Sequence, residues 1–359
     1  MNRSLTRKLI SVNFGSGPGR NLSRRSQSGV ALLLVVFLVA LASVLVLDLA
    51  YSTFLGGRLS ASAERQLQAE YLLKSALNIS RVLLREDKTI EDSPKDDWGI
   101  FKDGLAVPAE WLGLTQPNIQ VQLEIRPEDT KFPLRQLVPS GSAPNTKWVS
   151  SLYRLFQQMD FDNDKEADPS GPFKGKHFES RELIGNLLDY MDYDKESYSD
   201  GTYSGLEGQL PDGTFPNLPI QRVGELSVIP GFTAERIRRL YPFITARTTN
   251  SINLNFAPKA VLKALHADLS DASIDEIASF RDSEDGPFTQ AQWTSQIANF
   301  VSSDILDGPD GIRIMLSPAS RQFQVISKID YGTSTYFMQA LIEKGSPREL
   351  PKIRAFELY

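Results

Sequence analysis

The longest apolar run of the chain lies close to its N-terminus. Residues 30–47 read VALLLVVFLVALASVLVL, which is eighteen residues without a charge and with Ser43 as the one polar interruption. A run of this length can cross a bilayer as a helix. The pattern therefore predicts a transmembrane helix over about residues 30–50.

Helical periodicity continues beyond this run, over residues 60–85. Apolar residues recur there three or four positions apart, with charged residues between them. A helix unbroken from residue 30 to residue 85 would span roughly 85 Å at about 1.5 Å per residue. Gly56 and Gly57 leave an alternative open, in which a membrane helix and a soluble helix are joined at the glycines.

Alternating apolar and polar positions predict strands after the helix and at the C-terminus. Residues 119–125 (IQVQLEI) alternate as a half-buried strand does. Residues 323–329 and 335–342 flank a short turn at Gly332 and predict a hairpin. Residues 355–359 add an edge strand, and the long segment between the strands is predicted to be mostly helical.

These elements predict an α+β fold in which a long N-terminal helix packs on an antiparallel sheet, with a large helical insertion that contains a helix-hairpin-helix-like unit. The predicted boundaries are a leader at 1–29, the N-terminal helix at 30–86, a first sheet segment at 87–145, the insertion at 146–315 and a second sheet segment at 316–359.

The leader has the layout of a prepilin-type signal. It carries six basic residues and no acidic one, and positive charge beside a membrane span stays in the cytoplasm. A secretory signal has its small residue after a shorter apolar core. Here Gly29 precedes the core, which predicts cleavage between Gly29 and Val30 with the helix kept in the membrane. An ordinary N-terminal anchor is the alternative on charge and hydropathy alone.

Composition narrows the functional classes. The chain has no cysteine and therefore no disulfide, so a loop-rich domain outside the cytoplasm would need another stabilising link, such as a bound metal. A pI near 5.3 argues against nucleic acid as the main partner. Two histidines and no cysteine disfavour zinc sites, and no phosphate-binding loop or nucleophile motif is present. We therefore predict a protein that is not an enzyme.

Acidic residues crowd the first half of the insertion. Residues 157–212 contain fourteen acids and five bases. Such carboxylates repel one another unless they are solvated or bridged by a hard cation, and calcium takes six to eight oxygen ligands. Asp160, Asp162 and Asp164 imitate the start of an EF-hand loop, but Lys165 stands where that loop requires glycine. A solvated acidic loop is the alternative to a calcium site.

A second motif allows a different function. Residues 226–237 (LSVIPGFTAERI) resemble a helix-hairpin-helix turn, with Thr233 or Ala234 opening the second helix. DNA-binding versions hold a phosphate on the amides of a glycine-rich hairpin, and arginines follow here. A membrane-anchored DNA-handling protein is thus an alternative, although Phe232 and Thr233 replace the usual small residues and the neighbouring acids oppose a polyanion.

Four segments together resemble one family, the general secretion pathway protein K family, or minor pseudopilins K of type II secretion systems. In chain order they are residues 28–33 (SGVALL), 83–87 (LLRED), 187–194 (LLDYMDYD) and 252–262 (INLNFAPKAVL). The resemblance implies a precursor, cut by prepilin peptidase, with a single-pass helix in the inner membrane and a C-terminal domain in the periplasm. It implies a place at the pseudopilus tip with minor pseudopilins I, J and H and the major pseudopilin G.

The resemblance also indicates two sites. Asp189, Asp192, Asp194, Glu196 and Glu207 resemble the calcium-binding stretch of the family, which favours this cluster over Asp160, Asp162 and Asp164. Leu34 would be the fifth mature residue, where most pilin-like proteins have a glutamate that offsets the N-terminal amine of the next subunit. At the tip, where one side has no neighbour, such a glutamate would have no amine to pair with, and an unpaired charge in lipid is costly. A chain without that carboxylate therefore suits the tip. A minor tip pilin of a type IV pilus would have the same chemistry.

Overall fold

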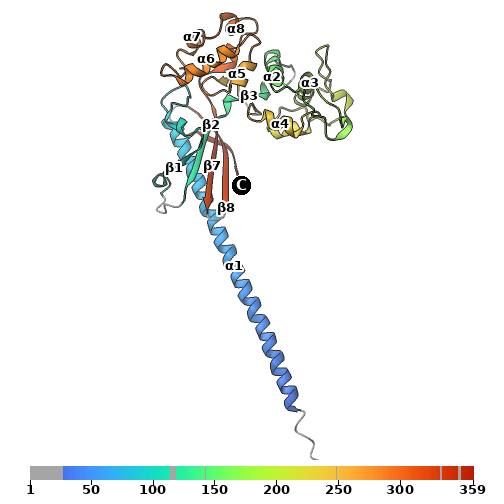
Figure 1. Ribbon diagram of the computed structural model, residues 1–359, viewed down its shortest axis with the longest axis vertical. Helices are drawn as coiled ribbons and strands as arrows, with labels where there is room; N and C mark the ends of the chain where they lie inside the picture. Colours follow the sequence, from blue (N-terminus) through green and yellow to red (C-terminus); the bar gives the residue numbers. More distant parts are fainter. Residues whose placement is uncertain (1–26, 114–118, 142, 248, 332–333, 347–348) are drawn as a thin grey trace, which may run out of the picture. The chain divides into compact units, whose positions relative to one another are not determined.

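The computed structural model describes residues 27–113, 119–141, 143–247, 249–331, 334–346 and 349–359, and the predicted leader lies almost wholly outside them. The described part of the chain divides into two compact units, one that ends at Arg65 and one that runs from Gln66 to Tyr359. The first unit is the apolar part of helix α1, and the second contains the rest of α1, a sheet and a helical insertion (Figure 1).

Helix α1 (Gln27–Glu86) is continuous, as the periodicity predicted (Figure 1). Gly56 and Gly57 lie inside it without a break, so the alternative of two jointed helices is wrong. Its last turns are amphipathic, because Ala69, Leu73 and Leu77 are buried while Leu67 and Tyr71 are exposed. The apolar residues from Val30 to Leu59 are exposed, as expected of a helix whose environment is lipid.

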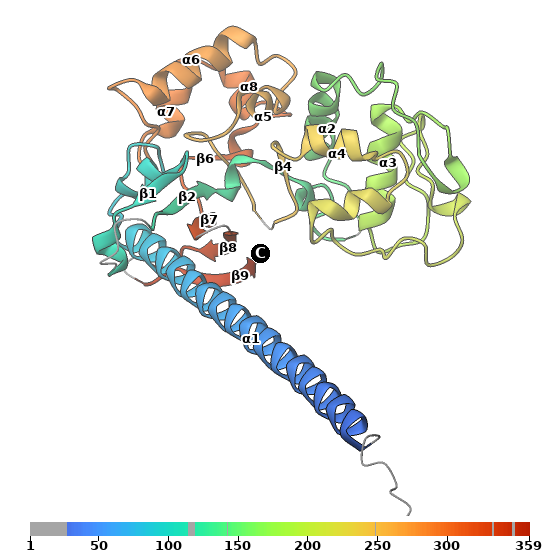
Figure 2. The same cartoon turned by 60° about the horizontal axis from the view of Figure 1, so that its bottom comes forward.

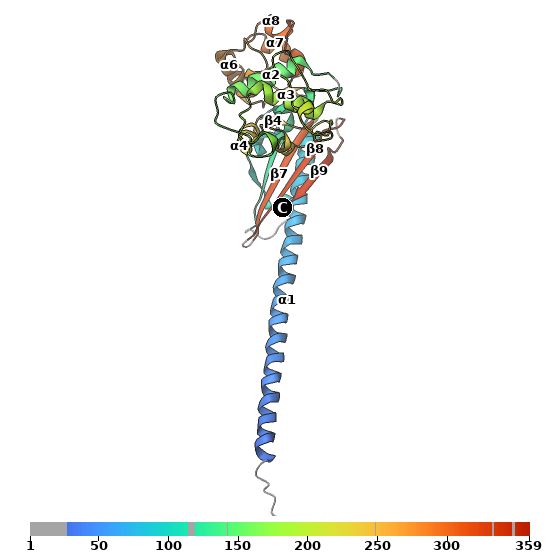
Figure 3. The same ribbon diagram turned by 90° about the vertical axis from the view of Figure 1, so that its right-hand side faces the viewer.

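The sheet that packs on residues 66–86 of α1 has five antiparallel strands in the order β1-β2-β7-β8-β9 (Figure 3). The strands are β1 (Leu105–Val107), β2 (Val121–Pro127), β7 (Gln322–Tyr331), β8 (Ser334–Glu343) and β9 (Lys352–Leu358). The predicted hairpin is β7–β8, and the predicted edge strand is β9. The α+β fold is confirmed, and β1 is an additional short edge strand that no sequence pattern indicated.

The insertion lies between β2 and β7 and forms two lobes (Figure 2). One lobe holds α2 (Thr146–Gln158), α3 (Ser180–Met191) and α4 (Ala234–Leu240); the other holds α5 (Lys259–Ala264), α6 (Asp271–Asp282), α7 (Trp293–Ile297) and α8 (Ser303–Asp307). Two short parallel pairs complete it, β3 (Phe132–Pro133) with β4 (Ile244–Thr245) and β5 (Ile252–Asn253) with β6 (Leu316–Ser317).

Irregular segments take a larger share of the insertion than the sequence suggested. Its α-helices are only five to thirteen residues long. Before β2 lie the 3₁₀ helices η1 (Asp97–Phe101) and η2 (Ala109–Leu112). Within the insertion, short 3₁₀ helices lie between the other elements: η3 (Glu128–Thr130), η4 (Leu134–Gln136), η5 (Gly171–Phe173), η6 (Glu207–Gln209), η7 (Val223–Val228) and η8 (Arg313–Met315). Aromatic residues such as Phe156, Phe161 and Phe232 hold these loops on one hydrophobic core, which is separate from the core under α1.

Two buried asparagines join the insertion to the segment that follows α1. Asn253 Nδ2 donates to Asp92 O at 3.2 Å, and Asn255 Nδ2 donates to Asp92 O at 3.3 Å and to Phe288 O at 3.0 Å. Helix α5 begins at Lys259, with Pro258 as its N-cap, and Asn255 is buried at this joint.

Candidate functional site

The apolar part of α1 is one candidate functional element. Within the described residues, the helix from Gly29 to Glu86 is long and apolar enough to cross a membrane, with a mean hydropathy of 3.3 in its most apolar window. Val30 and Leu34 are both exposed and lie four residues apart, so they share one face of the helix. An apolar side chain at residue 34 leaves this face uncharged.

Three of the predicted metal ligands meet beyond the end of α3. Asp192, Asp194 and Glu207, called the acidic trio below, have carboxylate oxygens that all lie within 4.8 Å of one another. Asp192 is buried, Glu207 is half-buried and opens η6, and Asp194 is exposed. The trio therefore has one side in the protein and one side open to solvent.

Asp189 positions the loop that carries the trio. It is fully buried near the end of α3, and its Oδ1 accepts from Tyr198 N at 2.6 Å while its Oδ2 accepts from Glu207 N at 2.8 Å. Gly205 permits this contact, since a Cβ there would lie 2.1 Å from Asp189 Oδ2. Burial raises the pKa of Asp189, and the two amides partly offset this effect. Asp189 thus holds the loop instead of joining the trio.

Asn217 contacts the trio from the other end of the same loop. It has a left-handed backbone conformation (φ +50°), which asparagine tolerates better than most residues. Its Nδ2 donates to Glu207 Oε1 at 2.8 Å and also to Asp194 O. Sequence reasoning missed Asn217, because no motif connects it with acids ten and more residues earlier.

The trio has unsatisfied oxygens. Asp192 Oδ1, Glu207 Oε2 and Asn217 Oδ1 are buried without a hydrogen-bond partner. Burial, together with the neighbouring charges of Asp194, Asp189 and Glu207, raises the pKa of Asp192 to about 7. Buried polar atoms are normally paired, so three orphaned oxygens around three carboxylates fit the donor set of a hard cation.

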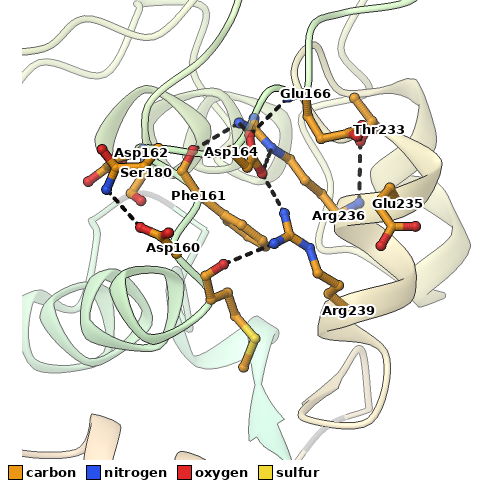
Figure 4. A network of polar contacts seen from close by, with 12 residues as sticks. Asp160, Phe161, Asp162, Asp164, Glu166, Ser180, Thr233, Glu235, Arg236 and Arg239 are labelled. Carbon is orange, nitrogen blue, oxygen red and sulfur yellow. Dashed lines mark hydrogen bonds and ion pairs between the residues drawn. The ribbon is translucent and has the colours of Figure 1, made fainter.

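The remaining predicted ligands lie elsewhere. Glu196 is exposed and is not a member of the trio. Asp160 Oδ1 accepts from Asn163 Nδ2, and Asp162 Oδ1 accepts from Ser180 N. Asp164 is the acceptor of two arginines, with Arg236 Nη2 at 2.6 Å from its Oδ1 and Arg239 beside its Oδ2 (Figure 4). The structure gives these three aspartates separate hydrogen-bonding roles and does not bring them to one point.

The Asp164 network fixes the hairpin before α4. Arg236 is fully buried, and its guanidinium also donates to Phe161 O and Gly231 O, both at 3.1 Å (Figure 4). Burial raises the pKa of Asp164, but its hydrogen bonds and ion pair with Arg236 outweigh this effect and lower the pKa overall. Gly231 has φ +89°, and a Cβ there would overlap Leu183 and Phe178, so the turn requires glycine.

The hairpin has its anion-binding groups already engaged. Thr233 caps α4, as predicted. Gly231 N donates to Asp168 Oδ2 at 2.8 Å, and Thr233 Oγ1 donates to Glu166 Oε2 at 2.6 Å. Arg238 pairs with Glu235, while Arg236 is buried on Asp164. Groups that would hold a nucleic-acid phosphate are therefore bonded to the carboxylates of the chain itself, which disfavours the DNA-handling alternative.

A second acidic group, which the sequence did not indicate, lies at the end of α1. Oxygens of Asp87, Asp92 and Asp96 also lie within 4.8 Å of one another. Here Lys344, at the end of β8, places its Nζ 2.9 Å from Asp87 Oδ2 and 2.9 Å from Asp92 Oδ1. Burial, partly offset by Lys344, raises the pKa values of Asp92 and Asp96 to about 6.

Comparisons with known proteins agree on one secretion component. Residues 130–249, which include the trio and the Asp164 network, match the family model of protein K of the type II secretion system. The structure is similar to a chain in the crystal structure of the GspK–GspI–GspJ complex from the type 2 secretion system of enterotoxigenic Escherichia coli. The TM-score is 0.59 at 17% identity, over 84% of this chain and 99% of that one. No curated protein matches the chain.

Proposed function

We propose that the chain is a member of the protein K family of type II secretion systems and acts as the minor pseudopilin at the tip of the periplasmic pseudopilus. In this role it starts filament assembly with other minor pseudopilins, so that folded proteins can be exported across the outer membrane. The role is structural and involves no catalysis. The observation that carries the proposal is the match over residues 130–249 in a chain that also has an exposed apolar α1.

Membrane insertion and processing are the first steps of the proposed role. Prepilin peptidase removes residues 1–29 on the cytoplasmic side, the new N-terminus of Val30 is methylated, and residues 30–50 anchor the chain in the inner membrane. The sheet and the insertion then face the periplasm. The six basic residues of the leader, which has no acidic residue, support this orientation.

Two features favour the tip over the shaft. Leu34 leaves no carboxylate to pair with the N-terminal amine of a subunit above, so the chain has no means of continuing the filament upward. The insertion is also a large addition to the sheet segment, and its two lobes extend beyond β1–β9 (Figure 2). A subunit of this bulk suits the one position without a neighbour on one side.

The proposed partners are the minor pseudopilins I and J, with minor pseudopilin H and the major pseudopilin G below them. Support comes from the similar chain, which was crystallised in a complex that contains GspI and GspJ. Helices in lipid associate by close packing and polar contacts, because lipid chains are as apolar as the helix surfaces and no hydrophobic effect drives the helices together. The family match favours type II secretion over a type IV pilus.

Processing can be tested directly. We would express the full chain with and without prepilin peptidase and measure its intact mass. Loss of residues 1–29 and addition of one methyl group support the proposal. An uncut chain, or a cut C-terminal to the apolar run, would make it an ordinary anchored or secreted protein.

We further propose that the acidic trio binds calcium. Asp192, Asp194 and Glu207 would supply carboxylate oxygens, and Asn217 is placed to add a carbonyl oxygen. Bound calcium would neutralise the three charges and tie together the two ends of a long loop in a chain without disulfides. The ion would stabilise the folded state, because its ligands come together only there.

Thermal unfolding tests the calcium proposal. With the full chain in detergent, calcium at 100 times its Kd should stabilise the fold by about 2.7 kcal/mol relative to chelator, if it binds the folded state alone. Magnesium at the same concentration is the control for a general salt effect. Equal melting temperatures in calcium and chelator would count against the site.

A further inference from the structure

The sheet is one strand wider than the helix that covers it. The hydrophobic core under α1 takes residues from β1, β2, β7 and β8, but none from β9. All seven residues of β9 are exposed, whereas β7 and β8 alternate between buried and accessible positions. Strand β9 also forms the open edge of the sheet, and in Figure 3 it lies outside β8.

The uncovered face of β9 is apolar. Leu358 pairs with Met338, Phe356 with Ala340 and Ile353 with Ile342, so each shares the sheet face of its partner. The three partners on β8 are buried against α1, with at most 1% of their surface exposed. The three residues on β9 are 39%, 51% and 40% exposed. An apolar face that continues the core without cover is unusual in a monomer and marks a contact surface.

Charge borders this face on the α1 side. Arg81 lies on the flank of α1 toward β9, because its Nε donates to Pro351 O at 2.7 Å. Its other contact is with Asn78, and neither Arg81 nor Lys352 at the start of β9 has a carboxylate partner among the described residues. The apolar stripe is thus flanked by two cations that can pair with acids from another chain.

The spacing between packed helices decides whether a partner helix or a partner strand would cover the apolar face of β9. Packed helices lie about 8–10 Å apart, which is about twice the 4.8 Å spacing of strands. A helix beside α1 would therefore rest on the neighbouring pair of strands and cover Ile353, Phe356 and Leu358. A strand added to the edge would pair with the backbone of β9 but leave these side chains open.

We propose that the apolar face of β9, with Arg81 and Lys352 beside it, docks an amphipathic helix of a partner pseudopilin. That helix has an apolar stripe for Phe356 and its neighbours and an acidic residue on the side toward α1. The inference rests on the proposed function, since it assigns a surface of this chain to its proposed partners I and J.

Co-purification tests the surface with a matched pair of variants. The full chain would be co-expressed with pseudopilins I and J and recovered in detergent. Phe356→Glu should lower recovery of the partners at least tenfold, because a glutamate would be buried against their helix. Ala355→Glu puts the same side chain on the opposite face of β9 and should leave recovery unchanged. Equal recovery with both variants would overturn the proposal.

Crosslinking then identifies the occupant. The chain has no cysteine, so Phe356→Cys creates a single thiol for a benzophenone label, and Glu357→Cys supplies the opposite face as control. We expect the label at residue 356 to attach to a helical segment of a partner and the control to attach to none. Attachment to a partner strand or to a second copy of this chain would contradict the proposal. Failure of the wild-type chain to co-purify with I and J would instead overturn the proposed function.

Discussion

The two acidic groups of the molecule share a geometry but differ in their surroundings. Both bring three carboxylates within 4.8 Å, and both include a buried aspartate with a raised pKa. At the end of α1, Lys344 binds Asp87 and Asp92. At the end of α3, no described cationic side chain pairs with Asp192, Asp194 or Glu207, and buried oxygens lack partners.

The difference shows how a cation site can be told from an internal ion pair. Clustered carboxylates alone do not separate the two cases, because both groups meet the same distance criterion. Hydrogen bonding does separate them. Both oxygens of Asp92 are bonded, one to Lys344 and one to Ser320 N, whereas Asp192 Oδ1 has no partner. We therefore assign the lysine as the permanent counter-charge of the first group and propose calcium for the second.

Removal of Lys344 should have the largest effect. Lys344→Met leaves Asp87 and Asp92 buried without a cation, which should lower the free energy of unfolding by about 3–5 kcal/mol. Urea unfolding of the full chain in detergent would measure this loss. Lys352→Met is the control, because Lys352 is exposed and its loss should cost less than about 0.5 kcal/mol. A loss below 1 kcal/mol for Lys344→Met would show that the group does not depend on its lysine.

Gly205→Ala should have an intermediate effect, confined to the calcium group. The new methyl would overlap the Asp189 carboxylate, so that the backbone or Asp189 must move, at a cost of about 1–3 kcal/mol. Because Asp189 holds Glu207 N, the variant should also weaken calcium binding. Gly224→Ala, which meets no atom within 4 Å, is the matched control. Unchanged stability and calcium affinity would show that Asp189 does not position the acidic trio.

We also predict a pH dependence of stability. The pKa of Asp192 is raised from 3.8 to about 7 in the folded chain, so between these values the folded state keeps a proton that the unfolded state releases. In chelator, this contribution to stability is complete below about pH 4 and is lost as the pH rises through about 7. Asp192→Asn should flatten that part of the stability profile. Saturating calcium should do the same in the wild type, because it favours the charged form.

Local sequence patterns predicted the long helix and four strands of the sheet. The features that they missed are one very short strand and a contact between distant residues. The eighteen-residue apolar run and the period of residues 60–85 predicted α1, and alternation predicted β2, β7, β8 and β9. The three-residue β1 is too short to show alternation. Asn255 is held in its buried joint by Phe288, a contact between residues 33 positions apart that no local pattern shows.

The same limit applies to the candidate site. Acid crowding indicated the segment, and the family resemblance selected within it Asp192, Asp194 and Glu207, which the structure brings together. The sequence could not separate them from Asp189 and Glu196, since the roles depend on which amides each carboxylate meets. Asn217 and Lys344 carry no local signal at all. Gly29 and Leu34 were singled out by their place relative to the apolar run, and their roles stay predictions.

Calorimetric titration of calcium into the full chain in detergent shows whether the acidic trio is a calcium site. We expect binding by the wild-type chain, loss of that binding in the double variant Asp192→Asn/Glu207→Gln, and unchanged binding in Asp96→Asn, because Lys344 already supplies the cation of that group. Absence of binding in the wild type, or binding that survives the double variant and disappears in Asp96→Asn, would contradict this assignment.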